Sequence, residues 1–203
     1  MDILIYPSYF PTISNYVAMA QADSITFEVE DNFQKQTNRN RTYIYSPNGI
    51  QLLNIPIKHT KERHQKTKDV RLETAFDWQK QHFKSLEAAY RTSPFFEYFE
   101  NELTPIFNKK HIFLMDLNFE TMEIISKCLR MKFDFKRTTE YFHEVSNYTD
   151  FRPLVNGKKE IMLFENYTQV FGEKYGFINN LSILDLLFNE GKFALDYLKN
   201  QKL

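Results

Sequence analysis

The spacing of apolar residues near the start of the chain predicts a strand, a helix and a second strand. Residues 3–6 form a short apolar run that Pro7 stops, as expected for a buried strand. Pro11 favours extended geometry before it and a helix after it, which we expect over residues 13–21. Residues 24–30 alternate apolar and polar side chains, which predicts a half-buried strand.

A hairpin is predicted next. Residues 41–46 and 51–57 flank the turn sequence PNG at 47–49 and read as two antiparallel strands. Residues 58–69 hold no apolar side chain, so we expect an exposed loop, followed by a short strand at 70–72.

Helical spacing dominates the second half of the chain. Helices are expected over residues 78–90, 94–107 and 114–129. The alternation in KFDFK, 132–136, predicts a strand, and the polar residues 143–160 predict a long loop. Ser182 and Asp185 resemble a capping box at the start of a last helix, which Gly191 ends.

The interleaving of helices and strands predicts the fold class. It favours an α/β layered domain over a bundle or a barrel, and we expect a Rossmann-like sandwich with a mixed or mostly parallel central sheet. At 203 residues and 42% hydrophobic content, the chain is expected to fold as one domain over residues 1–203.

Charge is distributed unevenly along a chain of zero net charge. Residues 1–33 hold five acids and no Lys or Arg, whereas residues 34–91 hold twelve basic residues against five acids. The middle segment is therefore where a phosphate or carboxylate is expected to bind, although its lysines are equally typical of a solvated surface. A neutral domain without a recognisable module argues against a nucleic-acid partner.

Other classes of function are disfavoured by missing patterns. The sequence shows neither a signal-peptide pattern nor an apolar run long enough to cross a bilayer, so we expect a soluble, cytoplasmic protein. The single Cys128 cannot form an internal disulfide. Zinc-ligand spacings and glycine-rich phosphate loops are also missing, so no metal site is expected and the sequence assigns no cofactor.

Two stretches carry candidate chemistry. In QKQTNRNR, 34–41, Arg39 and Arg41 offer donors to an anion, and in a strand they would share one face while Asn38 and Asn40 share the other. The alternative is a hairpin edge whose charges deter aggregation.

The predicted helix at 78–90 carries the second set, with His82 one turn after Trp78. His82 is a candidate general base, and Trp78 could stack on a ligand ring. The alternative is that both side chains belong to the core.

Several motifs in the same order resemble the WbqC-like protein family over nearly the full chain. They are YPSYFPTISNY, FQKQTNRNRTYI, LLNIPIKH, YRTSPFF and NNLSILDLLFNEG. The chain departs from the family pattern at Tyr6, where Gln is usual. Strand, loop, helix and strand also resemble the opening of nucleotidylyltransferase-like domains, but both histidines of their HxGH motif are missing, so adenylyl transfer by that mechanism is not supported.

The family resemblance implies a bacterial role in surface polysaccharide (O-antigen) biosynthesis. It suggests a transferase, with glycine or aminoacyl transfer to a sugar as one version, that binds a nucleotide-sugar or an activated amino acid. The alternative is a non-catalytic accessory protein that binds a nucleotide-sugar or a partner enzyme. Carried to this chain, the resemblance implies a set of site residues, namely Tyr9, Pro11, Asn40, Arg41, Lys58, Trp78, His82, Ser182 and Asp185. Among them His82 is the candidate catalytic residue, as a general base, and the others are expected to bind the substrate.

The aromatic stretch IYPSYFPTISNYVAMA, 5–20, spans the first predicted loop. It is either a hydrophobic corner stiffened by proline or a loop that lines a site. Its place between the first strand and the first helix favours the second interpretation, because α/β folds bind ligands at the carboxyl ends of strands.

Overall fold

The computed structural model describes residues 1–60, 63–157 and 162–203. Residues 61–62 and 158–161 lie outside the described residues, so parts of the predicted loops 58–69 and 143–160 cannot be compared with the structure.

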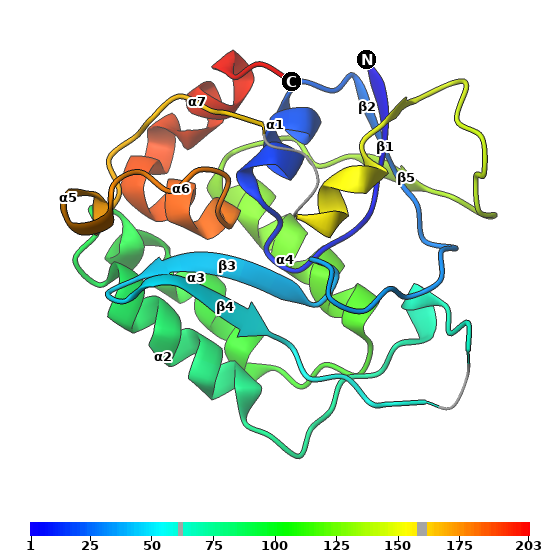
Figure 1. Cartoon of the computed structure of the whole chain (residues 1–203), viewed down its shortest axis with the longest axis horizontal. Helices are drawn as coiled ribbons and strands as arrows, with labels where there is room; N and C mark the ends of the chain where they lie inside the picture. The colour runs from blue at the N-terminus through cyan, green and yellow to red at the C-terminus, as the bar shows by residue number, and fades with distance from the viewer. Residues whose placement is uncertain (61–62, 158–161) are drawn as a thin grey trace.

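Four parallel strands form the central sheet (Figure 1). They are β1 Asp2–Ile5, β2 Ser24–Phe27, β5 Phe135–Arg137 and β6 Thr149–Asp150, in the spatial order β5-β2-β1-β6. Strand β1 lies inside the sheet, between β2 and β6. Its residues Ile3, Leu4 and Ile5 are therefore buried, with at most 1% of each exposed. All three strand pairs are parallel, and helices flank the sheet, which confirms the Rossmann-like α/β layered fold.

The predicted hairpin forms a second, two-stranded sheet. Strands β3 Arg41–Ser46 and β4 Gly49–Asn54 pair from Arg41↔Asn54 to Ser46↔Gly49. Gly49 has a φ of 95°, a conformation that favours glycine and closes the tight turn. Helix α2 packs against β3, so the hairpin lies alongside this helix (Figure 1).

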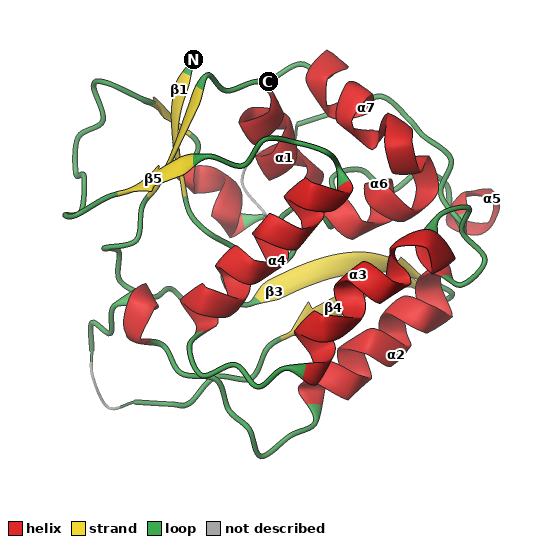
Figure 2. Cartoon of the chain, turned by 180° about the vertical axis from the view of Figure 1, so that it is seen from behind, coloured by secondary structure: helices red, strands yellow, loops and turns green. Residues whose placement is uncertain are grey.

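Seven α-helices occur in the described residues. They are α1 Ile13–Ala20, α2 Trp78–Tyr90, α3 Phe96–Asn108, α4 Leu114–Cys128, α5 Gly172–Tyr175, α6 Ile183–Glu190 and α7 Ala194–Asn200. Helix α4 lies near the sheet (Figure 2), where the Phe119 ring packs 5.2 Å from the rings of Phe27 and Phe135. This aromatic contact joins α4 to β2 and β5.

The structure differs from the sequence prediction in short elements. The predicted loop 143–160 contains β6 and the 3₁₀ turn Arg152–Asn156. The two residues of β6 become a strand only because they pair with β1, a contact that the local sequence does not show. The segment predicted as a strand at 70–72 makes the isolated bridges Ile57↔Leu72 and Arg71↔Phe113. The strand predicted at 132–136 begins only at Phe135.

Candidate functional site

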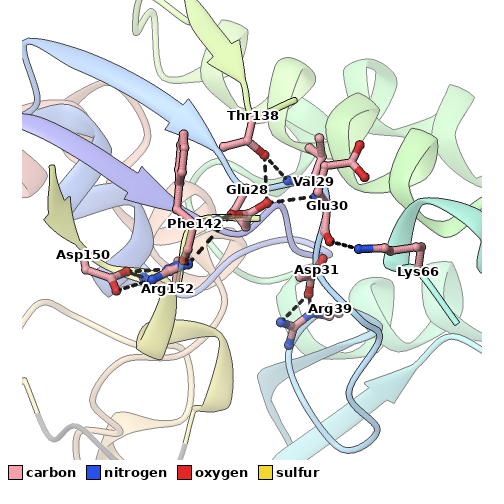
Figure 3. A network of polar contacts seen from close by, with 10 residues as sticks. All are labelled: Glu28, Val29, Glu30, Asp31, Arg39, Lys66, Thr138, Phe142, Asp150 and Arg152. Atoms are coloured by element: carbon pink, nitrogen blue, oxygen red, sulfur yellow. Dashed lines mark hydrogen bonds and ion pairs between the residues drawn. The ribbon is translucent and has the colours of Figure 1, made fainter. Parts of the chain in front are cut away.

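The parallel strands end at one edge of the sheet, where a buried polar network joins the loops that follow them (Figure 3). The fully buried carboxylate of Glu28, after β2, accepts from Thr138 Oγ1 at 2.8 Å and Phe142 N at 3.1 Å. Arg152, after β6, donates to Phe142 O at 2.6 Å and binds Asp150 through Nε and Nη2. The network holds together the loops at the carboxyl ends of the strands, which is the edge at which open α/β sheets bind ligands.

A buried ion pair closes the loop between β2 and β3. Arg39 donates to Asp31 Oδ2 from Nε at 2.9 Å and from Nη2 at 2.7 Å, and both side chains are at most 3% exposed. Its Nη1 donates to Thr37 Oγ1 at 3.2 Å, and its guanidinium lies 4.2 Å from the centre of the Tyr6 ring. The guanidinium of Arg39 therefore bonds to Asp31 and Thr37 in the protein interior and does not face a ligand at the surface. The Tyr6 ring forms one side of the pocket that holds the Arg39 guanidinium.

The residues before β3 do not form the strand face considered from the sequence. Strand β3 begins at Arg41, and residues 35–40 are turns and bends, so Arg39 and Arg41 do not lie on one strand. The physical reason is the buried carboxylate of Asp31, which holds Arg39 inward, while Arg41 remains half-buried at the protein surface. Only Arg41 of this pair faces a cavity.

The cavity beside Arg41 is a cleft of about 440 Å³ at the open end of the hairpin, which we call the hairpin cleft. This volume lies in the range of small-molecule sites. The lining combines two aromatic rings, three basic groups, three amides, one acid and an aliphatic strip: Phe33, Phe76, Lys35, Arg41, His59, Gln36, Asn40, Asn54, Glu73, Ile55, Pro56 and Ile57. Basic groups outnumber the acid, so the lining suits an anionic ligand with an apolar or aromatic part.

Asn54, the last residue of β4, connects several predicted site residues. Its Oδ1 accepts from Arg41 Nε at 3.1 Å and from Asn40 Nδ2 at 3.4 Å. Asn40 Nδ2 also donates to Ile55 O at 2.9 Å. Sequence reasoning missed Asn54, although a signal existed, because it is a polar residue that interrupts the apolar run of LLNIPIKH.

Tyr9, Trp78 and His82 form a buried cluster in the core, next to Asn54 of the cleft lining. His82 Nε2 bonds to Asn54 O at 3.2 Å, and Nδ1 bonds to Tyr9 OH at 3.0 Å. A carbonyl can only accept, so neutral His82 carries its proton on Nε2 and accepts from Tyr9 on Nδ1. Burial lowers the pKa of His82 to about 4, although the hydrogen bond to the Asn54 carbonyl acts in the opposite direction and raises it. His82 therefore supports Asn54 as a neutral imidazole.

The other predicted site residues lie elsewhere. Ile183 N donates to Pro11 O at 2.8 Å, and Ser182 caps α6 by accepting from Leu184 N. Asp185 does not complete a capping box, because its buried carboxylate accepts from Tyr90 OH at 2.8 Å and from two further donors.

Lys58 is exposed and lies between two residues of the cleft lining, Ile57 and His59. The structure thus brings Tyr9, Asn40, Arg41, Trp78 and His82 together around Asn54. Pro11, Ser182 and Asp185 are placed at the junction of the first loop with α6.

Fold and site together define an α/β protein with a basic, aromatic cleft beside a parallel sheet. The chain belongs to the WbqC-like protein family, whose model matches residues 6–157, as the sequence motifs predicted. It is 26% identical over 226 residues to the "Uncharacterized protein Rv1507c" of Mycobacterium tuberculosis, covering 97% of this chain and 96% of the relative. No solved structure matches the chain.

The family match contains the hairpin cleft and the network at the sheet edge, but neither Ser182 nor Asp185. Across residues 1–60, 63–157 and 162–203, no helix combines the length and apolar character needed to cross a membrane. Nor do three His, Cys, Asp or Glu side chains gather as metal ligands anywhere in those ranges.

Proposed function

We propose that the protein binds an anionic small molecule, an activated sugar or aminoacyl compound, in the hairpin cleft. In this proposal it holds an intermediate of bacterial surface polysaccharide (O-antigen) biosynthesis. The family membership supports the setting, and the chemistry of the cleft supports the ligand class.

The observation that carries the proposal is the state of Arg41. Its Nε is bonded to Asn54, and neither Nη has a partner among the residues that the structure describes. The planar guanidinium is thus held in place by one donor and presents its remaining donors to the cleft, as bidentate recognition of a phosphate or carboxylate requires. His82, itself bonded to Tyr9, donates to the backbone carbonyl of Asn54 from the core, so the residue that holds Arg41 is positioned before a ligand arrives.

The test is an affinity measurement with the protein and its Arg41→Gln variant. We expect UDP-glucose or a related anionic donor to bind, and Arg41→Gln to weaken binding by about 10- to 100-fold, the loss of a hydrogen bond to a charged group. Lys84→Gln is the matched control, because it removes one positive charge from an exposed position on α2. Equal affinity in wild type and Arg41→Gln would contradict the proposal.

Transfer chemistry is a second candidate, favoured by the imidazole of His59 in the lining of the same cleft. A transferase needs a base that takes a proton from the acceptor hydroxyl or amine. His82 remains the sequence-based candidate, but it would first have to release the Tyr9 hydroxyl or the Asn54 carbonyl. A donor–acceptor panel read by mass spectrometry tests this. Product made by wild type but not by His59→Gln or His82→Gln variants that still bind donor supports transfer, whereas no product from any pair counts against it.

A further inference from the structure

We propose that a second cavity, next to the hairpin cleft, binds the neutral, hydroxyl-rich part of the ligand, a glycosyl unit. The cavity measures about 260 Å³ and lies on the outer side of the hairpin, between the loop before β3 and the segments at 156–157 and 178–181. The inference deepens the proposed function, on which it relies only for the anionic part of the ligand.

The lining of this second cavity is polar but uncharged. Amides and hydroxyls dominate it, and within the described residues it contains no Lys, Arg, His, Asp or Glu. The polar groups come mainly from Thr12, Gln36, Asn38, Tyr43, Asn156 and Asn180. Because amides both donate and accept, such a lining suits a ligand with many hydroxyls and no charge. The ring of Tyr43 and the side chain of Ile50 add an apolar wall for the C–H face of a sugar.

Several of these polar groups are available to a ligand. The side chains of Gln36, Tyr43 and Asn156 make no hydrogen bond within the described part of the chain, and none of the three is buried. Asn38 Nδ2 also has no partner there, although the residue is only 4% exposed. A buried amide donor without a partner is costly, but this nitrogen has almost no accessible surface, so Gln36, Tyr43 and Asn156 are the groups that a ligand would reach first. Asn180 is already occupied, because its Oδ1 accepts from Ser14 N at 2.9 Å.

The two cavities are placed for one ligand. Arg41 lines the hairpin cleft and Tyr43 lines the second cavity, and these residues are two apart on β3. Side chains at alternate strand positions share a face and lie about 7 Å apart. Gln36 lines both cavities. A glycosyl group with an attached phosphate therefore fits the pair, with the sugar at Tyr43 and the phosphate at Arg41.

The experiment maps binding by NMR with three probes: free monosaccharides (glucose, galactose and N-acetylglucosamine), UDP, and UDP-glucose. We expect the free sugars to shift the side-chain amide signals of Gln36, Asn38 and Asn156. Tyr43→Phe and Asn156→Ala should each weaken sugar binding by about two- to tenfold, the loss of one neutral hydrogen bond, and leave UDP affinity unchanged. Asn101→Ala, at an exposed position on α3, is the control and should change neither.

The outcomes separate this inference from the proposed function. If UDP does not bind but free sugars still shift these amides, the proposed anion site fails and the glycosyl site stands. If none of the sugars shifts them, or if both variants bind sugar as wild type does, the glycosyl site is overturned, whatever Arg41→Gln does to UDP.

Discussion

His82 should make the stability of the protein depend on pH in a way that one substitution removes. Its side chain is 5% exposed, and burial lowers its pKa from 6.5 to about 4. The unfolded chain takes up a proton at this histidine below about pH 6.5, while the folded protein does so only near pH 4. The stability contributed by neutral His82 is therefore almost fully present above pH 6.5, falls as the pH drops from 6.5 toward 4, and is lost once the pH has passed through 4. Linkage gives a loss of about 2 kcal/mol at pH 5 and about 3 kcal/mol at pH 4.

Urea unfolding of wild type and His82→Gln at pH 7 and pH 5 measures this loss. Titration of the carboxylates is common to both proteins, so the difference between their unfolding free energies isolates His82. We expect that difference to fall by about 2 kcal/mol between pH 7 and pH 5. His64→Gln, in an exposed position, should follow wild type at both pH values. A difference that does not change with pH would refute the account of His82 as a buried, neutral support for Asn54.

Two further predictions concern positions that shape the fold. Gly191→Ala should destabilise by more than 2 kcal/mol in urea unfolding, because its Cβ would lie 2.5 Å from the Phe95 ring at a φ of 53°. Gly176→Ala is also at a positive φ, but its Cβ would meet no atom within 4 Å, so it should lower the free energy of unfolding by less. Equal destabilisation by the two substitutions would show that the clash with Phe95 is not the cause. Asp31→Ala should cost about 3–5 kcal/mol by leaving Arg39 buried without its partner. The double variant with Arg39→Met should recover part of the lost stability, because it removes the unpaired buried charge. If the destabilisations of the two single variants simply add, the two side chains do not depend on each other.

Regular elements could be predicted from local pattern alone. Helix α2 has the predicted bounds, Trp78–Tyr90, because its apolar residues repeat with helical spacing and Ser93-Pro94 follows. The hairpin followed from its turn sequence. Strand β6 could not be predicted, because two residues carry no periodicity and its partner β1 is distant in the chain.

The candidate site was predictable in its residue types but not in its contacts. Residue type alone offered both Arg39 and Arg41 as donors to an anion, whereas the fold pairs Arg39 with Asp31 and leaves Arg41 at the cleft. No local pattern distinguishes them, since the distinction depends on which guanidinium meets a buried carboxylate. Tyr9 and His82, predicted as site residues, lie in the core instead, where His82 bonds to the carbonyl of Asn54 and Tyr9 bonds to His82.

A crystal structure of the protein with UDP-glucose tests the central claim most directly. The account predicts a phosphate oxygen within hydrogen-bond distance of an Arg41 Nη atom, with the ligand in the hairpin cleft. A phosphate bound at another place, such as the polar cavity of about 360 Å³ lined by Tyr6, Lys66 and Tyr141, would contradict it.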